Sequence, residues 1–174
     1  RLGLAEPIKT SVLQHAQQLG LQGQRRVVDL EFAAKLDAST GSLTWNTFMG
    51  GSGYDEGRSV AVDGSGNVYV AGISPSTWGS PVRAYTAGDD GFAAQLNSSG
   101  VLQWNTFLGG SEGDFSYSIT VDGSRNLYLA GQSSETWGSP VQAFSSGVDA
   151  FAAKLNASTG SLTWNTFLGG TGND

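Results

Sequence analysis

The sequence contains one segment three times, at nearly constant spacing. The copies are AAKLDASTGSLTWNTFMGG (33–51), AAQLNSSGVLQWNTFLGG (93–110) and AAKLNASTGSLTWNTFLGG (152–170). Between them lie two copies of a second segment, SVAVDGSGNVYVAG (59–72) and SITVDGSRNLYLAG (118–131). A period of about 60 residues indicates a solenoid, a propeller or a related array, so it constrains the fold more than any other feature. It also argues against an enzyme, because residues present in every copy are most simply those that build the repeat.

Within each repeat, hydrophobic and polar residues alternate with a period of two, which is typical of short strands. Turn-forming clusters separate these strands: DGSGN (63–67) and DGSRN (122–126) join one pair, and DASTGS, NSSG and NASTGS join the other. One period therefore holds two hairpins, or four antiparallel strands. This is the composition of a β-propeller blade, so we predict an all-β fold of about two and a half propeller repeats.

The first 31 residues lie outside the repeat. Pro7 is followed by apolar residues at helical spacing up to Gly20, which predicts a short N-terminal helix over about 6–19. The sequence thus divides into a non-repeat segment and a region of repeats. The predicted boundaries are 1–31 for the first segment and 32–91, 92–150 and a partial 151–174 for the repeats.

Composition excludes several functional classes. The net charge of −6 argues against a nucleic-acid partner or an anionic membrane surface, which both require a basic patch. The absence of cysteine excludes disulfides and thiolate metal sites. No apolar run approaches the roughly 20 residues that a membrane span needs.

The segments FAAKL, LTWNTFLGG, GSGYDEG and VAVDGSGNVYVAG resemble, in this order, the bacterial seven-bladed β-propeller repeat family. The resemblance covers residues 32–174. It implies an exported or cell-surface bacterial protein, and it implies no catalytic motif. Two features depart from the family pattern: the added segment S-x-x-T-W-G-S-P-V, and a number of repeats too small for seven blades.

The repeat number predicts open edges. Residues 32–174 supply about 2.4 blades, whereas a closed propeller needs about four to eight. Exposed sheet faces and edges favour association. We therefore expect self-association or further repeats of a larger parent chain, or else a cap formed by residues 1–31.

Acidic turns offer candidate ligands. GSGYDEG (51–57), GSEGDFS (110–116) and the terminal GTGND place Asp55, Asp114 and Asp174 in equivalent positions. The hairpin turns add oxygen atoms that suit Ca²⁺. A structural role in the turn backbone is the favoured interpretation, and no cofactor is predicted. The weak Ca²⁺ candidates are Asp63, Asn67, Asp122 and Asn126.

Two loop tryptophans, Trp78 and Trp137, occur in TWGSPV segments at equal positions of the repeat. They are candidates, with Asp55 and Asp114, for a ligand-binding surface on which a sugar or proline ring would stack. The alternative, which we favour, is that each indole covers the outer edge of its blade. The strand tryptophans are predicted to be core residues: Trp45, Trp104 and Trp164.

No catalytic residues are predicted. The single histidine, His15, lies in the predicted helix, and the adjacent acid pairs Asp55–Glu56 and Asp89–Asp90 are interpreted as solvated turn charges. The sequence favours a non-enzymatic extracellular module with a structural or binding role. The alternatives are a carbohydrate-active or carbohydrate-binding propeller, with a glycan or protein ligand, and a self-assembling ring or filament subunit.

Overall fold

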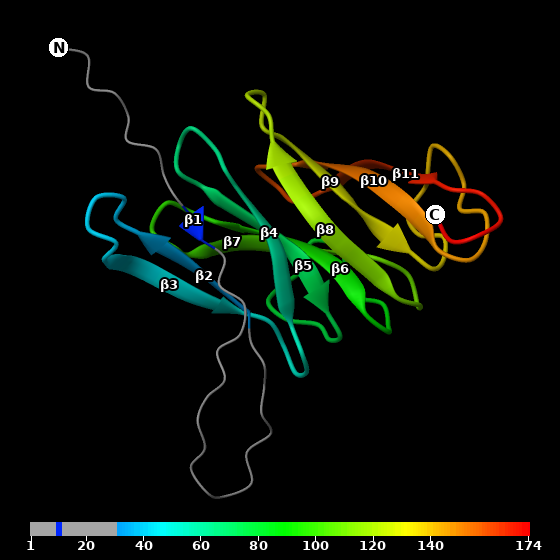
Figure 1. Ribbon diagram of the computed structural model, residues 1–174, viewed down its shortest axis with the longest axis horizontal. Coiled ribbons are helices and arrows are strands. Elements are labelled where there is room, and N and C mark those ends of the chain that lie inside the picture. Colours follow the sequence, from blue (N-terminus) through cyan, green and yellow to red (C-terminus); the bar gives the residue numbers. More distant parts are fainter. Residues whose placement is uncertain (1–9, 12–30) are drawn as a thin grey trace, which may run out of the picture.

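The computed structural model describes residues 10–11 and 31–174, which form three antiparallel sheets (Figure 1). The first sheet has the order β1-β2-β3, and the other two have four strands each, in sequence order across the sheet. The predicted all-β propeller architecture, with two hairpins in each full period, is confirmed. In each four-stranded sheet, short turns close two hairpins, and a longer loop, 75–89 or 134–148, joins one hairpin to the other. The repeat of the sequence thus becomes a repeat of sheets.

The strand bounds follow the two repeated segments. The first sheet contains β1 (Thr10–Ser11), β2 (Glu31–Leu36) and β3 (Leu43–Met49). The second contains β4 (Glu56–Val62), β5 (Val68–Ser74), β6 (Asp90–Leu96) and β7 (Leu102–Leu108). The third contains β8 (Asp114–Val121), β9 (Asn126–Ser133), β10 (Asp149–Asn156) and β11 (Leu162–Leu168).

The sheets begin half a period later than the repeats of the sequence. Each four-stranded sheet starts at the acidic turn, so the blades span 56–108 and 114–168, whereas the sequence was divided at residues 32, 92 and 151. The hairpin β2–β3 corresponds to the outer half of a blade. A sequence period can be cut at any phase, and hydrogen bonding between strands selects this one.

The predicted helix over 6–19 falls almost entirely outside the described residues. Its two described residues, Thr10 and Ser11, pair with Lys35 and Ala34 as strand β1. In the second sheet, β5 pairs with β6 at the corresponding place, where Tyr69 faces Gln95. A segment outside the repeat therefore occupies the position of a repeat strand.

Two hydrophobic cores lie between successive sheets. One is formed where β2 and β3 pack on the second sheet, and the other where the second sheet packs on the third. The second and third sheets contact each other closely where β8, the first strand of the third sheet, lies against β4 and β5 (Figure 1). This arrangement places β4 and β8 side by side, and the candidate sites described below lie along them.

Candidate functional site

The acidic turns between blades share one geometry. The second glycine of each GG pair donates its backbone N–H to a carboxylate four residues later: Gly51 to Asp55 at 3.0 Å and Gly110 to Asp114 at 2.7 Å. The terminal Asp174 accepts the same bond from Gly170 at 2.7 Å. The predicted equivalence of these three aspartates is confirmed. Each carboxylate closes the turn that leads from the outer strand of one blade to the first strand of the next.

A second buried carboxylate meets Asp114 at the junction between the second and third sheets. Asp90 opens β6, and both aspartates are fully buried. A Cβ atom added to Gly109 would lie 2.7 Å from an oxygen of each carboxylate, so both side chains pack closely against this glycine. Thr86 donates its backbone N–H to Asp90 at 2.9 Å, and Ser133 donates its hydroxyl to Asp114.

Burial raises the pKa of both carboxyls at this junction. The pKa of Asp90 rises to about 7 and that of Asp114 to about 6, in each case mainly through desolvation. Hydrogen bonds from Thr86 and from Ser133 and Gly110 oppose the shift, and Glu135 adds to it. Both carboxyls therefore take up a proton at a higher pH than an ordinary aspartate does.

An arginine ties this junction together from the loop side. Arg83 donates to the carbonyl oxygens of Phe107 at 3.0 Å and Gly109 at 2.7 Å, and its guanidinium lies 5.5 Å from the ring centroid of Trp137. Desolvation lowers its pKa, while the charges of Asp90 and Asp114 raise it. The guanidinium therefore binds backbone carbonyls in the turn and only balances the aspartates at longer range.

The neighbouring junctions also contain buried acids. Glu31 is buried beside Asp55, and its pKa rises to about 8 through burial and the nearby charges of Asp55 and Glu56. Asp149, at the place of Asp90 in the third sheet, accepts the backbone N–H of Ser145 at 2.9 Å. Sequence analysis missed Glu31 and Asp149. The available signal was the spacing of 59 residues between Asp90 and Asp149.

The adjacent acid pairs of the sequence do not form shared sites. Asp90 lies near Asp114, 24 residues further along the chain, and both pack against Gly109. Asp55 accepts a hydrogen bond from the backbone of Gly51, whereas Glu56 forms an ion pair with Arg58. The pairing that the structure makes thus crosses from one sheet to the next. In each pair the first acid precedes a strand, and the second, Glu56 or Asp90, is the first residue of that strand.

The weak Ca²⁺ candidates are turn residues. Asp63 accepts hydrogen bonds from the backbone N–H groups of Ser65 and Asn67, from the Asn67 amide and from the Tyr69 hydroxyl, at 2.8–3.0 Å. Asp122 repeats the pattern with Ser124, Asn126 and Tyr128. These oxygens close their own hairpins. Within the described part of the chain, no group of three or more acidic or histidine side chains is arranged to hold a metal ion.

Trp78 and Trp137, the candidate stacking residues, do not present their rings to solvent. Both indoles are buried, and Trp78 packs edge-on against Phe92 and Phe107, while Trp137 packs against Phe151 and an equivalent partner in β11. No ring face is left for a ligand. The alternative interpretation is supported, because the loops pair with the outer strand of their blades.

Backbone hydrogen bonds show how these loops cover the edge. Val82 donates to the carbonyl of Asn105 at 2.8 Å, and Phe107 donates to that of Arg83 at 3.1 Å. The Asn105 amide donates to the Trp78 carbonyl at 2.8 Å, and Asn165 repeats this with Trp137. The TWGSPV segment therefore protects the outer edge of each four-stranded blade from pairing with other strands.

A bulge occurs at the same position of β4 and β8. The pairing register shifts between Gly57 and Ser59 in β4, and between Ser116 and Ser118 in β8. The extra residues are Arg58 and Tyr117. A bulge leaves one residue outside the ladder and redirects its side chain, and bulges are frequent beside binding sites.

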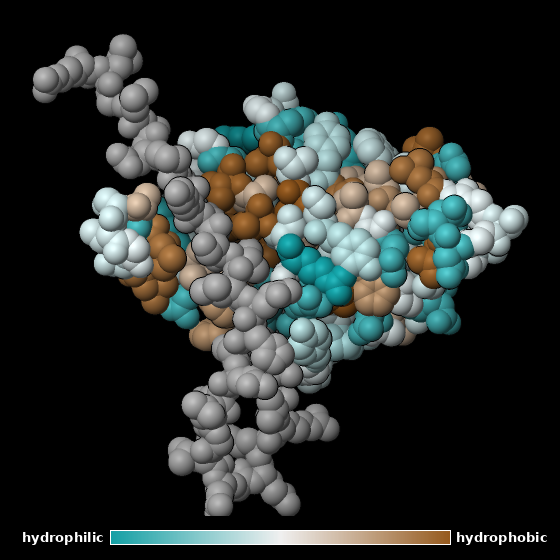
Figure 2. Space-filling model, in the orientation of Figure 1, coloured by the Kyte–Doolittle hydropathy of each residue, from teal (hydrophilic) through white to brown (hydrophobic). Residues whose placement is uncertain are grey.

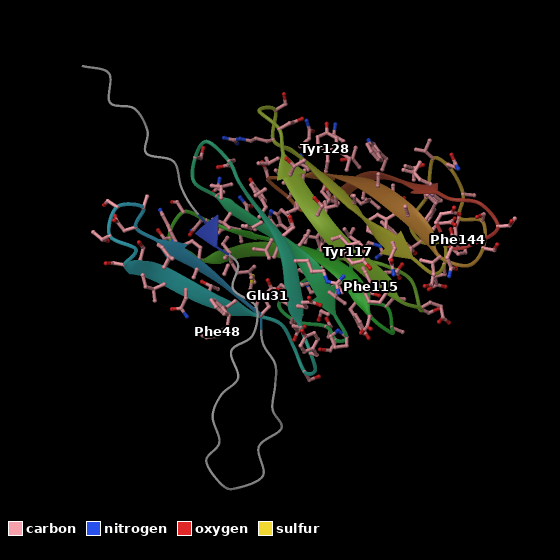
Figure 3. All side chains as sticks on the ribbon, viewed as in Figure 1. Glu31, Phe48, Phe115, Tyr117, Tyr128 and Phe144 are labelled. Carbon is pink, nitrogen blue, oxygen red and sulfur yellow. The ribbon has the colours of Figure 1, made fainter. Side chains whose placement is uncertain are left out.

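These redirected side chains meet between the two strands. The Arg58 guanidinium lies 4.7 Å from the ring centroid of Tyr117 and 5.9 Å from that of Phe115, and it forms an ion pair with Glu56 at 2.9 Å. The rings of Phe115 and Tyr117 are nearly parallel on β8 (Figure 3). Tyr117 is 41% exposed, so this group forms part of the surface.

A cleft of about 330 Å³ lies beside this group, where β4 and β5 approach β8. It combines aromatic, aliphatic and charged side chains, a composition typical of ligand sites. Sequence analysis named Asp55 here, but the side chain of Asp55 is buried in the turn. The lining residues are Tyr54, Glu56, Arg58, Ile73, Pro75, Asp89 and Phe115.

His15, the only histidine of the sequence, lies outside the described residues. The part of the chain that the structure describes contains no helix long and apolar enough to cross a membrane. The candidate sites are thus the buried acids of the junctions and the cleft beside Arg58. They differ in character, because the first is closed to solvent and the second is open.

Comparison with known families agrees with the sheets. Residues 45–79 and 103–136 match the family described as beta-propeller repeat. The first match begins at Trp45 and the second at Gln103, the residue before Trp104. Each then runs through the GG turn and the first two strands of a blade and ends in the TWG segment, at Gly79 or at Thr136. No curated protein matches the chain significantly. The two matches and the four-stranded sheets together support a beta-propeller repeat family for this chain.

Proposed function

We propose that the chain is a non-enzymatic β-propeller repeat module that acts outside the cell as a structural scaffold with a binding surface. The use of its recurring carboxylates supports this proposal. Asp55, Asp114 and Asp174 close blade junctions, and Asp63 and Asp122 close hairpins. Side chains that would be catalytic candidates by residue type are thus occupied in holding backbone.

The buried pair Asp90 and Asp114 is the strongest alternative for catalysis, because glycosidases use two carboxyls with different pKa values. Both side chains are fully buried, and Gly109 lies against them without room for a Cβ atom. A substrate has no access to this pair without opening the junction. Burial therefore favours a structural role within the junction over general acid–base catalysis.

Turnover assays test the non-enzymatic proposal. The full chain is incubated with a panel of chromogenic glycosides and esters, and Asp114→Asn is assayed in parallel. We expect no turnover by either protein, and a changed melting temperature for the variant. Hydrolysis by the wild-type chain that disappears in Asp114→Asn would overturn the proposal.

The binding surface in this proposal is the cleft beside Arg58. Phe115 lines the cleft with an apolar ring, and Glu56 and Asp89 line it with hydrogen-bond acceptors. The ring of Tyr117 lies parallel to that of Phe115, next to the cleft. Aromatic rings beside a few polar groups suit a sugar or a peptide. A carbohydrate ligand is the second candidate function, and the stacked aromatic pair on β8, of which Tyr117 is exposed, favours it.

Glycan arrays probed with the full chain test the carbohydrate candidate. Binding to a glycan should be lost in Tyr117→Ala and kept in Val141→Ala, because Val141 is exposed on the outer loop away from the cleft. Equal loss in both variants, or binding unchanged by Tyr117→Ala, would exclude the cleft. Cell fractionation with an antibody against the chain tests the extracellular location.

A further inference from the structure

The structure contains one interface between sheets twice. One side of a sheet, here called the Trp face, carries a strand tryptophan and the last apolar residue of the same strand. It packs on the opposite side of the following sheet, here called the Phe face, which carries two phenylalanines. The Trp faces in contact are Trp45, Met49 and Ala33, then Trp104, Leu108 and Ala93; the Phe faces are Phe92, Leu96 and Phe107, then Phe151, Leu155 and Phe167.

A tryptophan seated on a turn fixes the register of both interfaces. The indole N–H of Trp45 donates to the Ser98 carbonyl at 3.1 Å, and that of Trp104 donates to the Ala157 carbonyl at 3.1 Å. Each ring lies on the glycine of that turn, Gly100 or Gly160, so closely that a Cβ atom would be 2.6 Å from the ring. Both glycines have positive φ, +81° and +70°. The interface therefore combines apolar packing with a specific hydrogen bond and a close contact between an indole ring and a glycine.

The Trp face of the third sheet is open. Leu168 is 53% exposed, whereas its counterpart Leu108 is fully buried, and Ala130 is exposed where Ala71 is buried. Trp164 has the position of Trp104 and is only half-buried. In the described residues no turn lies on its ring.

The Phe face of the first sheet is also open. Phe48 is 55% exposed, whereas its counterpart Phe107 is fully buried, and apolar surface lies over β2 and β3 in Figure 2. The turn 37–42 is exposed throughout. Gly41 has a φ of +72°, close to the +70° of Gly160, and no described atom lies within 4 Å of where its Cβ would be. The glycine of the turn 37–42 therefore has the backbone conformation of the glycines that contact Trp45 and Trp104, but no described indole lies against it.

We propose that a second copy of this chain docks here, with Trp164 of one copy on the turn 37–42 of the next. The proposal rests on the proposed scaffold function and names its partner. The two faces are different, so the contact is head-to-tail and leaves one free face at each end. Lys154, the cross-strand neighbour of Trp164, is then brought toward Asp37 of the turn, which adds opposite charges to an apolar contact.

The decisive experiment uses two variants, each with one face blocked. Leu168→Asp places a charge on the Trp face, and Phe48→Asp places one on the Phe face. In light scattering, the wild-type chain should increase in mass with concentration, and each variant alone should stay monomeric. An equimolar mixture of the two should form dimers and nothing larger. Leu168→Asp keeps an unblocked Phe face and Phe48→Asp keeps an unblocked Trp face, so only one contact can form between them.

Controls separate the outcomes. Val141→Asp adds the same charge outside both faces and should associate like wild type, and circular dichroism must show that each variant keeps its strands. A wild-type chain that is monomeric at every concentration overturns the proposal, and so does a mixture that fails to dimerise. A monomeric wild-type chain is the result expected if residues 1–30 of the same chain cover the Phe face. Mass and turnover are independent, so a monomer without hydrolytic activity overturns this interface and leaves the scaffold function standing.

Discussion

Trp104 donates its indole N–H to the main-chain carbonyl of Ala157, across the boundary between two blades. The residues are 53 positions apart, as are Trp45 and Ser98 at the previous boundary. One side chain thus joins a strand of one sheet to a turn of the next. Since the donor is buried at Trp104, this bond cannot be replaced by water without opening the interface.

Replacing Trp104 should be costly. We expect Trp104→Ala to lower the free energy of unfolding by about 3–5 kcal/mol, because it removes a large buried ring and leaves the Ala157 carbonyl without its donor. Urea denaturation monitored by circular dichroism measures this. Trp164→Ala is the matched control and should cost clearly less, because that ring is only half-buried. An equal loss of unfolding free energy in the two variants would contradict the tight packing of Trp104 against the turn of the third sheet.

The first glycine of the GG turn should not tolerate a methyl group. Gly109→Ala places a Cβ atom 2.7 Å from oxygens of Asp90 and Asp114, so one carboxylate must move. We expect a lower melting temperature, equivalent to about 1–3 kcal/mol for overpacking. Gly123→Ala, in an exposed turn with open space around it, should change the melting temperature little. A neutral Gly109→Ala would mean that the junction is loosely packed.

Stability should fall as pH rises through neutrality. The pKa of Asp90 in the folded chain is about 7, above the ordinary aspartate value of 3.8, so the folded chain binds more protons than the unfolded chain between these values. Asp114, at about 6, adds to the effect. The melting temperature should therefore be higher at pH 5 than at pH 8.

Asp90→Asn tests the origin of this pH dependence. An amide cannot ionise, so the variant should be more stable than wild type at pH 8 and should show a flatter dependence on pH. Asp89→Asn removes the same charge from a partly exposed neighbour and should keep the wild-type slope. A slope that is the same in Asp90→Asn and wild type would assign the effect to other acids, of which Glu31 is the first candidate.

The hairpin aspartates should act without a metal ion. We expect Asp63→Ala to cost about 1–3 kcal/mol, because four donors lose their acceptor, and Asp122→Ala to behave alike. The pKa of Asp63 is lowered, so its contribution is present above its unfolded pKa and is lost as pH falls through the folded value. Adding Ca²⁺ should leave the wild-type melting temperature unchanged. A calcium-dependent increase that Asp63→Ala abolishes would restore the metal hypothesis.

The strands and hairpins were predictable because each is a local pattern. Alternation in LTWNTFL and the turn DGSGN determine a strand and its connection within a few residues. The start of each blade was not predictable, because a periodic sequence has no marked origin. Pairing of β5 with β6, across the loop 75–89, and contact of β4 with β8 depend on how the hairpins and sheets come together, which no short segment encodes.

The sites show the same limit. Equivalent positions of Asp55 and Asp114 followed from the repeat, but the partner Asp90 lies in another part of the period and reaches Asp114 only through sheet packing. The direction of Trp78 was also undetermined, since a loop residue can turn inward or outward. The redirected side chains of Arg58 and Tyr117 depend on a shift of one residue in pairing, and that shift leaves no mark in the alternation of the strand.

The bulge has a consequence for how such a protein can diversify. Arg58 and Tyr117 occupy the same place in successive blades and differ in size and charge, while the serines that follow them, Ser59 and Ser118, are identical. Because the bulged residue makes no ladder pair, its identity is decoupled from the register of the blade. An array of these repeats can therefore acquire a new side chain beside β4 and β8 one blade at a time, with the supporting scaffold inherited unchanged.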